Sequence, residues 1–307
     1  MGKFVTTWVG ECSSWECDDL GHLNMRHYMT KTAQARQMLI IKLGIENAFR
    51  ADSVSSVRVR DFHIKYQGEA RPGDPLRIES GVIALRKNTA TLCHMMYHFD
   101  GRIAASIVEN VAHVSLLTGK SFPWPKRAHL AQKTFKVGAP APSKPRGLTY
   151  DTIASAPSEK RLKKLGMKPI GMGVFQPNEV GVQGHVTTQA FLGRVTETVA
   201  SVVSGWPELH DKEARTLGHT GALLEARGFL HKRAAAGDPY HMYSGVIDVN
   251  EYTRTLIHHL VDAQSGKSLF SAQAVGCLFN MKTRKLMKAT PAQIARVEAE
   301  IIPGLCV

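Results

Sequence analysis

The stretch GDPLRIESGVI at residues 73–83 returns as GDPYHMYSGVI at residues 237–247. Both the turn sequence Gly-Asp-Pro and the strand-like sequence Ser-Gly-Val-Ile recur 164 positions after their first occurrence. Gly-Asp-Pro alone is a common turn, but the longer match indicates a repeated structural unit. Because such a unit determines the architecture even where its copies have diverged, the match predicts two copies of one fold in this chain.

The match extends in both directions at nearly the same spacing. EVGVQGHVTTQAF at residues 179–191 follows ECDDLGHLNMRHY at residues 16–28 by 163 positions. SGKSLFSAQAVG at residues 265–276 follows DGRIAASIVENV at residues 100–111 by 165 positions. Between the copies the chain is rich in Pro, Ser, Ala and Lys, which is typical of a linker. We therefore predict an N-terminal domain at 1–125, a linker at 126–165 and a C-terminal domain at 166–307.

Each copy has the same order of elements. A strand-like segment and a polar loop precede a helix, which apolar spacing predicts up to Gly44 in the first copy and up to Gly205 in the second. Four runs with alternating, β-branched or aromatic residues follow and predict neighbouring antiparallel strands. They are VRVRDFHIKY, LRIESGVIAL, TATLCHMMYHFD and AASIVENVAHVSLL in the first copy, and GALLEARGFLH, HMYSGVIDV, TRTLIHHLVDA and FSAQAVGCLFNM in the second. One helix on one curved antiparallel sheet, twice, is an α+β fold.

The composition is that of an ordinary globular protein with an excess of positive charge. The chain has 307 residues, 43% of them hydrophobic, and a formal net charge of +13. Without a long apolar run or an apolar leader, we expect a cytoplasmic protein that does not enter a membrane. Five cysteines without a C-x-x-C pair favour reduced thiols over a disulfide framework or a zinc site. The charge favours an anionic partner, but nucleic acid is disfavoured because no element interleaves aromatic and basic residues.

The loop ECDDLGHLNM at residues 16–25 and the segments after it resemble a known family. The residues that carry the resemblance are Asp18, Gly21, His22, Leu23, Asn24, Tyr28, Ala35, Arg36, Tyr66, Pro72, Gly73, Asp74, Thr118, Gly119 and Lys120. In this order they resemble the hotdog-fold acyl-CoA thioesterases of the 4-hydroxybenzoyl-CoA thioesterase type, well over residues 1 to about 125 and weakly over residues 165 to about 290. Relatives with one hotdog unit work as dimers, so the resemblance implies an intramolecular pseudo-dimer of two tandem hotdog units.

The resemblance also implies a catalytic site in this loop. Asp18 takes the position of the catalytic carboxylate, acting as nucleophile or general base, and the backbone N–H of Met25 that of the group that polarises the thioester carbonyl. A helix N-terminus suits this role because its N–H groups are unpaired and its dipole favours negative charge. Other readings remain open: Asp18 as a turn residue, Asn24 as a helix cap or as a residue that orients water, and His22 as a substrate contact or a loop residue.

The second copy departs from this pattern at the position of the catalytic carboxylate. Gly181 aligns with Asp18, so the second loop lacks the carboxylate. Glu197 aligns with Gln34 on the helix, where some hotdog thioesterases carry their catalytic acid. Glu197 would then complete the site around Asp18 or act in a second one, and an exposed helix glutamate is the alternative.

A basic segment in the first copy is a candidate contact for coenzyme A. Arg86, Lys87, Asn88 and Thr89 stand where the family often contacts the phosphates or pantetheine of CoA, and positive charge suits these phosphates. The aligned residues 250–253 of the second copy read NEYT and include an acid. One functional site per chain is the simplest interpretation. A solvated hairpin turn is the alternative for residues 86–89.

These features together predict an acyl-CoA thioesterase with no metal and no redox cofactor, for which CoA is part of the substrate. A hotdog hydratase or dehydratase is the first alternative, although the Asp and His before an Asn-Pro that mark that branch are missing. A non-catalytic acyl-CoA-binding protein is the second, and the retained Asp18 argues against it. The acyl group, the choice between CoA and acyl carrier protein, and assembly of the pseudo-dimer into homo-oligomers stay open.

Overall fold

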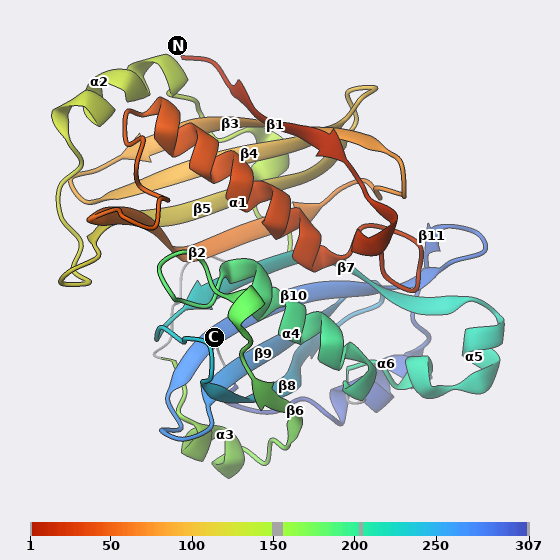
Figure 1. Ribbon diagram of the computed structural model, residues 1–307. Helices are drawn as coiled ribbons and strands as arrows, with labels where there is room; N and C mark the ends of the chain where they lie inside the picture. Colours follow the sequence, from red (N-terminus) through yellow and green to blue (C-terminus); the bar gives the residue numbers. More distant parts are fainter. Residues whose placement is uncertain (1, 149–155, 203–204, 306–307) are drawn as a thin grey trace. The chain divides into compact units, whose positions relative to one another are not determined.

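The computed structural model describes residues 2–148, 156–202 and 205–305. The chain forms two compact units. Unit 1 comprises Met1–Lys144 and Val180–Gln189, and unit 2 comprises Pro145–Glu179 and Ala190–Val307. Each unit contains an antiparallel sheet and a helix that lies along it (Figure 1), which is the predicted α+β hotdog architecture. The domain boundaries at residues 125 and 166 stay a prediction.

Unit 1 has the strand order β1-β3-β4-β5-β2, with every neighbouring pair antiparallel. The strands are β1 (Val5–Glu11), β2 (Ser55–Tyr66), β3 (Pro75–Leu85), β4 (Thr89–His98) and β5 (Ile103–Ser115). The helices are α1 (Met25–Lys42) and α2 (Lys126–Phe135). Helix α1 packs on β1, β3 and β4 through side chains such as Met29, Leu39 and Ile40, which are fully buried.

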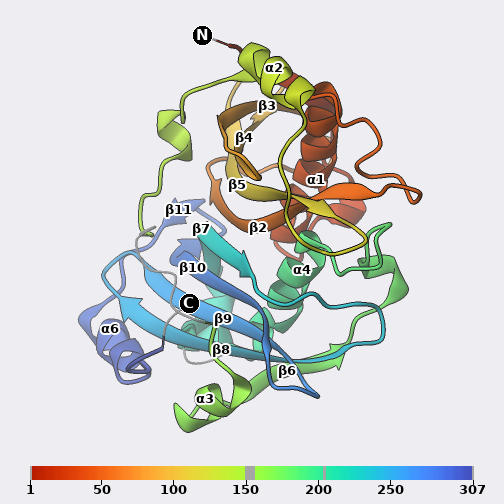
Figure 2. The same cartoon turned by 90° about the vertical axis from the view of Figure 1, so that its left-hand side faces the viewer.

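Unit 2 repeats this arrangement with the strand order β7-β10-β9-β8-β6. The strands are β6 (Pro169–Val174), β7 (His219–Leu230), β8 (Pro239–Val249), β9 (Arg254–Asp262), β10 (Ser268–Asn280) and β11 (Lys285–Leu286), the last of which pairs with β10. The helices are α3 (Glu159–Lys164), α4 (Thr188–Thr198), α5 (Lys212–Thr216) and α6 (Pro291–Glu298). Helices α4 and α6 lie on opposite faces of this sheet (Figure 2).

Irregularities of the two sheets occur at equivalent positions. The pairing of β3 with β4 shifts after Val82, and the pairing of β8 with β9 shifts after Val246. The edge strands β1 and β6 are likewise interrupted at Thr7 and Ile170, which are 163 positions apart. Because a bulge inserts one residue at a specific place, matching bulges indicate a common ancestral unit rather than a chance likeness. The repeat seen in the sequence is therefore a repeat of structure.

The Gly-Asp-Pro turn that begins the repeat opens β3 and β8. Gly73 and Gly237 have φ values of +87° and +91°, a left-handed conformation that other residues rarely adopt. The carboxylates of Asp74 and Asp238 accept hydrogen bonds from backbone N–H groups three residues earlier, at 2.8 and 2.9 Å. Proline then starts each strand, where it is tolerated without its N–H. The local backbone structure thus explains why glycine, aspartate and proline each occur in this turn.

The two long helices differ in length, and the predicted end of the second one at Gly205 is wrong. Helix α1 has 18 residues and is followed by Gly44 with φ +83°. Helix α4 has 11 residues and ends at Thr198, after which the chain forms a 3₁₀ turn at Val199–Ser201. The sequence there, VTETVASVV, is rich in β-branched residues, which lose side-chain freedom in a helix and favour an early end.

A charged cluster lies inside unit 1. The carboxylate of Glu109 on β5 is fully buried and lies 2.6 Å from Nη1 of Arg36 on α1. Its second oxygen is 3.4 Å from Nε2 of His94, whose Nδ1 is hydrogen-bonded to Oγ of Ser80 at 2.6 Å. Burial raises the pKa of Glu109, but the charge of Arg36 and the contact with His94 outweigh it and hold the pKa below its usual range.

Unit 2 keeps only half of this cluster. Its serine–histidine pair is Ser244 and His258, with Oγ and Nδ1 2.8 Å apart. Glu109 faces Leu92 across the β4–β5 pair, and Ala274 faces Leu256 at the equivalent place in unit 2. Arg36 is replaced by Val199, 163 positions later. In unit 2 Ala274 is buried, whereas Val199 follows the end of α4 and is 47% exposed, so neither charge of the pair is present there.

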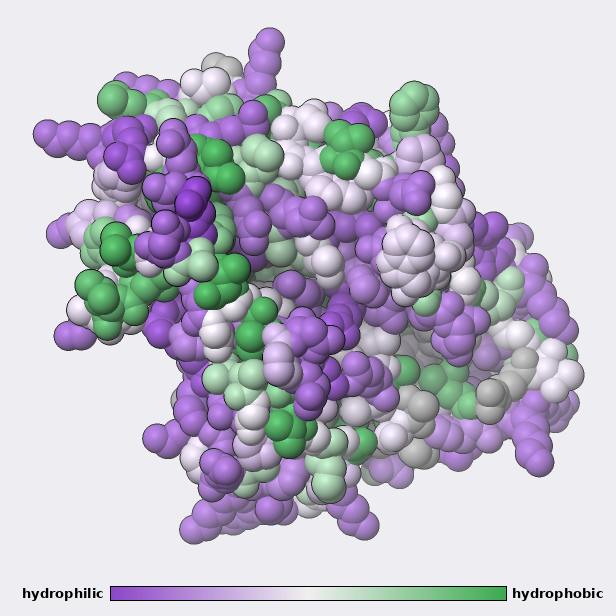
Figure 3. All heavy atoms as spheres, in the orientation of Figure 1, coloured by the Kyte–Doolittle hydropathy of each residue, from purple (hydrophilic) through white to green (hydrophobic). Residues whose placement is uncertain are grey.

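The surface drawn in Figure 3 is mostly hydrophilic, with apolar residues in small scattered groups. Isolated exposed apolar side chains are normal on protein surfaces. Within residues 2–148, 156–202 and 205–305, no helix combines the length and the apolar character needed to cross a membrane.

Candidate functional site

The loop that carries Asp18 connects β1 to α1 and closes on itself. The N–H of Asp18 donates to the carbonyl of His22 at 3.0 Å, and the N–H of Gly21 donates to the carbonyl of Asp18 at 3.0 Å. Gly21 has φ +75°, which permits the tight turn between them. The N–H of Leu23 donates to the carbonyl of Ala70 at 2.8 Å and ties the loop to the segment before β3.

The carboxylate of Asp18 is held in place and still accessible. Its Oδ1 accepts a hydrogen bond from the N–H of Leu20 at 3.0 Å, which is an Asx-turn, and its Oδ2 lies 3.3 Å from Nδ1 of His22. About a fifth of each side chain is exposed, 21% for Asp18 and 20% for His22. A positioned carboxylate within reach of solvent can act on a bound substrate or on a water molecule.

Helix α1 begins directly after this loop. Asn24 is the N-cap, and its Oδ1 accepts a hydrogen bond from the N–H of Arg26 at 3.0 Å. Of the readings open for Asn24, the helix cap is thus observed. Met25 is the first helical residue, so its N–H has no acceptor within the helix. The structure therefore brings Asp18, His22, Asn24 and Met25 together at one helix N-terminus.

A largely covered glutamate, Glu16, anchors this loop to α1. The carboxylate of Glu16 accepts hydrogen bonds from the N–H of Ser13 at 3.0 Å and from Nζ of Lys31 at 2.6 and 2.8 Å. Lys31 is 3% exposed, and its ammonium also lies over the ring of Trp8. An ion pair with so little water around it resists screening and fixes the loop against the helix. Glu16 therefore has a structural role in folding this loop.

The second loop uses the same anchor. Glu179 accepts from the N–H of Gln176 at 2.8 Å and is ion-paired with Arg194, which stands 163 positions after Lys31. The backbone repeats as well, because the N–H of Gly181 donates to the carbonyl of His185 at 2.9 Å. The scaffold of the loop is thus preserved in the second copy, whereas the carboxylate at the position of Asp18 is lost.

Glycine at position 181 has no conformational reason to be there, and this can be tested. Gly181 lies outside the left-handed region, and an added Cβ would meet Thr187 Cγ2 at an ordinary 3.8 Å. Gly184 in the same loop has φ +72°. We expect Gly181→Ala to leave the free energy of unfolding unchanged or raise it by up to about 1 kcal/mol. Gly184→Ala should lower it by about 1–2 kcal/mol.

Denaturant titration of the two variants side by side makes the comparison. Equal destabilisation by both substitutions would show that Gly181 is required by the loop, and would remove the argument that the missing carboxylate is a functional loss.

Glu197 lies near the end of α4 and belongs to unit 2. Its side chain is 49% exposed, and its Oε2 is 2.5 Å from Nη1 of Arg194. Arg194 in turn pairs with Glu179, so Glu197 takes part in the anchor of the second loop. A catalytic role for Glu197 stays a prediction.

The basic segment at residues 86–89 lies at the far end of the sheet from Asp18. Arg86 to Asn88 form the turn between β3 and β4, and the N–H of Arg86 donates to the carbonyl of Thr89 at 2.8 Å. The Asp18 loop contacts the residues just before the start of β3, whereas Arg86 follows its end. An 11-residue strand spans roughly 35 Å. Within unit 1 the structure therefore does not bring this hairpin to Asp18.

Two tyrosines near the loop were not among the predicted site residues. The rings of Tyr28 on α1 and Tyr66 on β2 pack edge to face with centroids 5.1 Å apart. Burial raises the pKa of Tyr28, and the negative charge of Asp18 adds to the effect. The buried hydroxyl of Tyr66 has no hydrogen-bond partner among the described residues. The sequence signal that could have identified these two tyrosines is that both belong to the family motif.

The cysteines are relevant to the predictions of reduced thiols and of no zinc site. Cys12, Cys17, Cys93 and Cys277 are free, and Cys306 lies outside the described residues. The Sγ atoms of Cys12 and Cys17 are 3.5 Å apart at the base of the Asp18 loop, and burial raises the pKa of Cys12 to about 12. Across the described ranges, no cluster of three or more His, Cys, Asp or Glu side chains is arranged to hold a metal ion.

Comparison with known proteins gives a family and a fold. The model of the thioesterase-like superfamily matches residues 12–133 and again residues 175–299. An acyl-ACP thioesterase from Bacteroides thetaiotaomicron superposes with a TM-score of 0.65 at 11% identity, covering 89% of this chain and 97% of the other. The 12:0-ACP thioesterase from Umbellularia californica superposes with a TM-score of 0.64 at 13% identity, covering 88% and 93%. No curated protein matches the chain in sequence.

Proposed function

The chain belongs to the thioesterase-like superfamily, and on that premise we propose that it hydrolyses an acyl-CoA thioester to the free acid and CoA at the Asp18 loop. The observation that carries the proposal is the carboxylate of Asp18, held by Leu20 and His22 beside the N-terminus of α1 and still a fifth exposed. Thioester hydrolysis needs a group that attacks or activates water, and a second group that holds the developing oxyanion.

The proposed chemistry assigns one role to the Asp18 carboxylate and another to the N–H of Met25. The Asp18 carboxylate either removes a proton from water as the oxygen attacks the thioester carbon, or attacks that carbon itself to form a mixed anhydride that water then cleaves. In both routes the C–S bond breaks, and the thiolate leaves and takes up a proton. The N–H of Met25 stabilises the negative carbonyl oxygen, because it has no acceptor within the helix and lies at the positive end of the helix dipole.

We propose one such site per chain. The second loop repeats the fold of the first but has Gly181 in place of the acid. The ion pair of Glu197 with Arg194 supports a role for Glu197 in holding that loop. The hairpin at residues 86–89 is left outside the proposed site, because it lies at the opposite end of β3 from Asp18.

The experiment that tests the function is a thiol-release assay over a panel of acyl-CoA esters with short, long, branched, aromatic and charged acyl groups. The two structural relatives named above are acyl-ACP thioesterases, so matched acyl-ACP substrates belong in the panel. We expect release of free thiol from at least one ester, and its preferred acyl group identifies the substrate class. Acyl-CoA that binds without thiol release would favour a binding protein, and hydration of an enoyl-CoA would favour a hydratase.

A further inference from the structure

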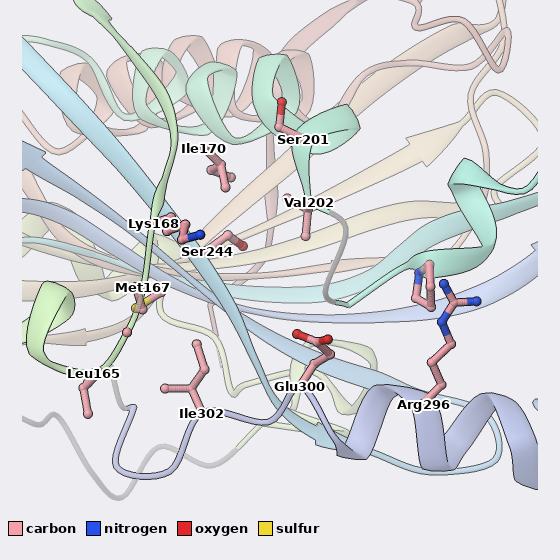
Figure 4. Close-up of a pocket in the computed structure, with 12 residues that line it drawn as sticks. Leu165, Met167, Lys168, Ile170, Ser201, Val202, Ser244, Arg296, Glu300 and Ile302 are labelled. Atoms are coloured by element: carbon pink, nitrogen blue, oxygen red, sulfur yellow. The ribbon is translucent and has the colours of Figure 1, made fainter.

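A cavity of about 430 Å³ opens in unit 2 beside the edge strand β6. Apolar side chains, among them Met167, Ile170, Val202 and Ile302, form much of its wall (Figure 4). This volume is in the range of small-molecule sites, which are mostly apolar with a few polar groups. No part of the Asp18 loop lines the cavity.

The early end of α4 accounts for this cavity. Helix α1 has 18 residues and α4 has 11, so α1 continues for about two more turns over its sheet. In unit 1 these turns carry Leu39 and Ile40, both fully buried. In unit 2 the position of Leu39 is taken by the smaller Val202, which lines the cavity after the helix has ended.

Three charged side chains reach this cavity, two of them positive. Lys168 approaches it from the segment before β6, and Glu300 from the segment after α6, while Arg296 lies on α6 (Figure 4). All three side chains are exposed, and no hydrogen bond or ion pair links any of them to another described residue. The lining therefore carries a net positive charge that is in contact with solvent.

Unit 1 has uncharged residues at the same three places. The parallel bridges Val82–Lys136 and Val246–Ile301 align the segments that follow α2 and α6, 165 positions apart. The counterparts of Lys168, Arg296 and Glu300 are then Val5, Ala131 and Phe135. The charges at this cavity are thus a property of unit 2 and are not required by the hotdog fold.

Ser244 gives the cavity a hydrogen-bond donor. In unit 1 the hydroxyl of Ser80 is shared with Thr7 at 2.7 Å, but Ile170 replaces this threonine in unit 2. Ser244 has His258 as its partner at 2.8 Å and lines the cavity. Burial lowers the pKa of His258 to about 4, so the ring is neutral at pH 7 and can donate from Nδ1. In the tautomer that carries its proton on Nδ1, the ring donates to Ser244, whose hydroxyl can then donate to a ligand.

We propose that this cavity is a binding site for an aliphatic carboxylate. The alkyl chain would lie against Met167, Ile170 and Val202, and the carboxylate would pair with Lys168 and accept a hydrogen bond from Ser244. Glu300 disfavours a second negative group on the same ligand. The proposal does not rest on hydrolysis at Asp18, because none of the residues involved belongs to that loop.

Isothermal titration with octanoate, and with octanol and octylamine as probes of equal chain length, tests the site. We expect octanoate to bind the full-length protein and Lys168→Met to weaken that binding up to about fivefold, because the variant keeps the apolar stem and removes an exposed charge. Octanol binding should change less than about twofold. Lys164→Met, at an exposed lysine on α3 outside the cavity, is the matched control. Asp18→Asn should bind octanoate like wild type, whatever its activity.

Val202→Trp provides an independent arm, since the larger ring fills the cavity. If this variant keeps the circular dichroism of wild type, it should lose both octanoate and octanol. Absence of octanoate binding to wild type, equal weakening by Lys168→Met and Lys164→Met, or full binding by a folded Val202→Trp would each overturn the proposal.

Discussion

Asp18→Asn should lower the turnover number of the preferred thioester by about 10²- to 10⁴-fold, the usual contribution of a general base or its equivalent. Asparagine keeps an oxygen at the Oδ1 position, so the hydrogen bond from the Leu20 N–H at 3.0 Å and the Asx-turn survive. The loop should retain its shape, and KM should change little. Steady-state kinetics of purified wild type and variant, with circular dichroism to verify folding, measures both quantities.

The neighbouring acid supplies a matched control. Asp19 is exposed and lies in the same turn, so Asp19→Asn removes the same charge from the same loop without touching the proposed site. It should keep the activity of wild type within about twofold, since an exposed charge is screened by water and salt. A similar loss in both variants would mean that the loop needs negative charge in general. Full activity of Asp18→Asn would return Asp18 to a turn residue.

Arg36→Val should destabilise the protein by about 3–5 kcal/mol, because it leaves the fully buried Glu109 carboxylate without its cation. Removing both charged groups leaves no uncompensated buried charge, and unit 2 has the buried Ala274 at the position of Glu109. The double variant Arg36→Val with Glu109→Ala should therefore recover much of the loss. Chemical denaturation followed by fluorescence gives the three free energies. A double variant as unstable as the sum of the single ones would contradict this account.

The acid dependence of stability gives a second readout. In wild type the pKa of Glu109 is held below its ordinary value of about 4.3, so its stabilising contribution is complete above that pH and is lost as pH falls through the lowered pKa. Without Arg36, burial dominates and the pKa of Glu109 is raised. The deficit of Arg36→Val should therefore shrink as pH is lowered towards 5. The exposed pair of Arg50 and Asp52 is the control, and Arg50→Ala should have no measurable effect.

The architecture was accessible from the sequence because its signals are local. The Gly-Asp-Pro turns, the alternating strand residues and the glycine after α1 each reflect the backbone conformation at their own position. The same local patterns occur again 163 to 165 positions later, so each element is indicated twice. The Asp18 loop was accessible for the same reason, since its acid, glycine and capping asparagine lie within seven residues.

Other features depended on residues that are distant in the sequence. The end of α4 at Thr198 was missed because apolar spacing continues beyond it, and the β-branched content that ends the helix is only a weak preference. Residues 86–89 could be placed far from Asp18 only once the direction of β3 was known. Arg36, Glu109 and His94 are ordinary surface residue types whose burial together follows from packing α1 on the sheet.

The sequence by itself thus determined that the chain has two copies of one α+β unit and that the first loop alone carries the acid. Tertiary structure decided which charges are buried, which candidate residues share a site, and where unit 2 leaves a cavity. The physical reason is that backbone conformation is governed by neighbours along the chain. Burial, ion pairing and cavities arise only when segments far apart in the sequence pack together.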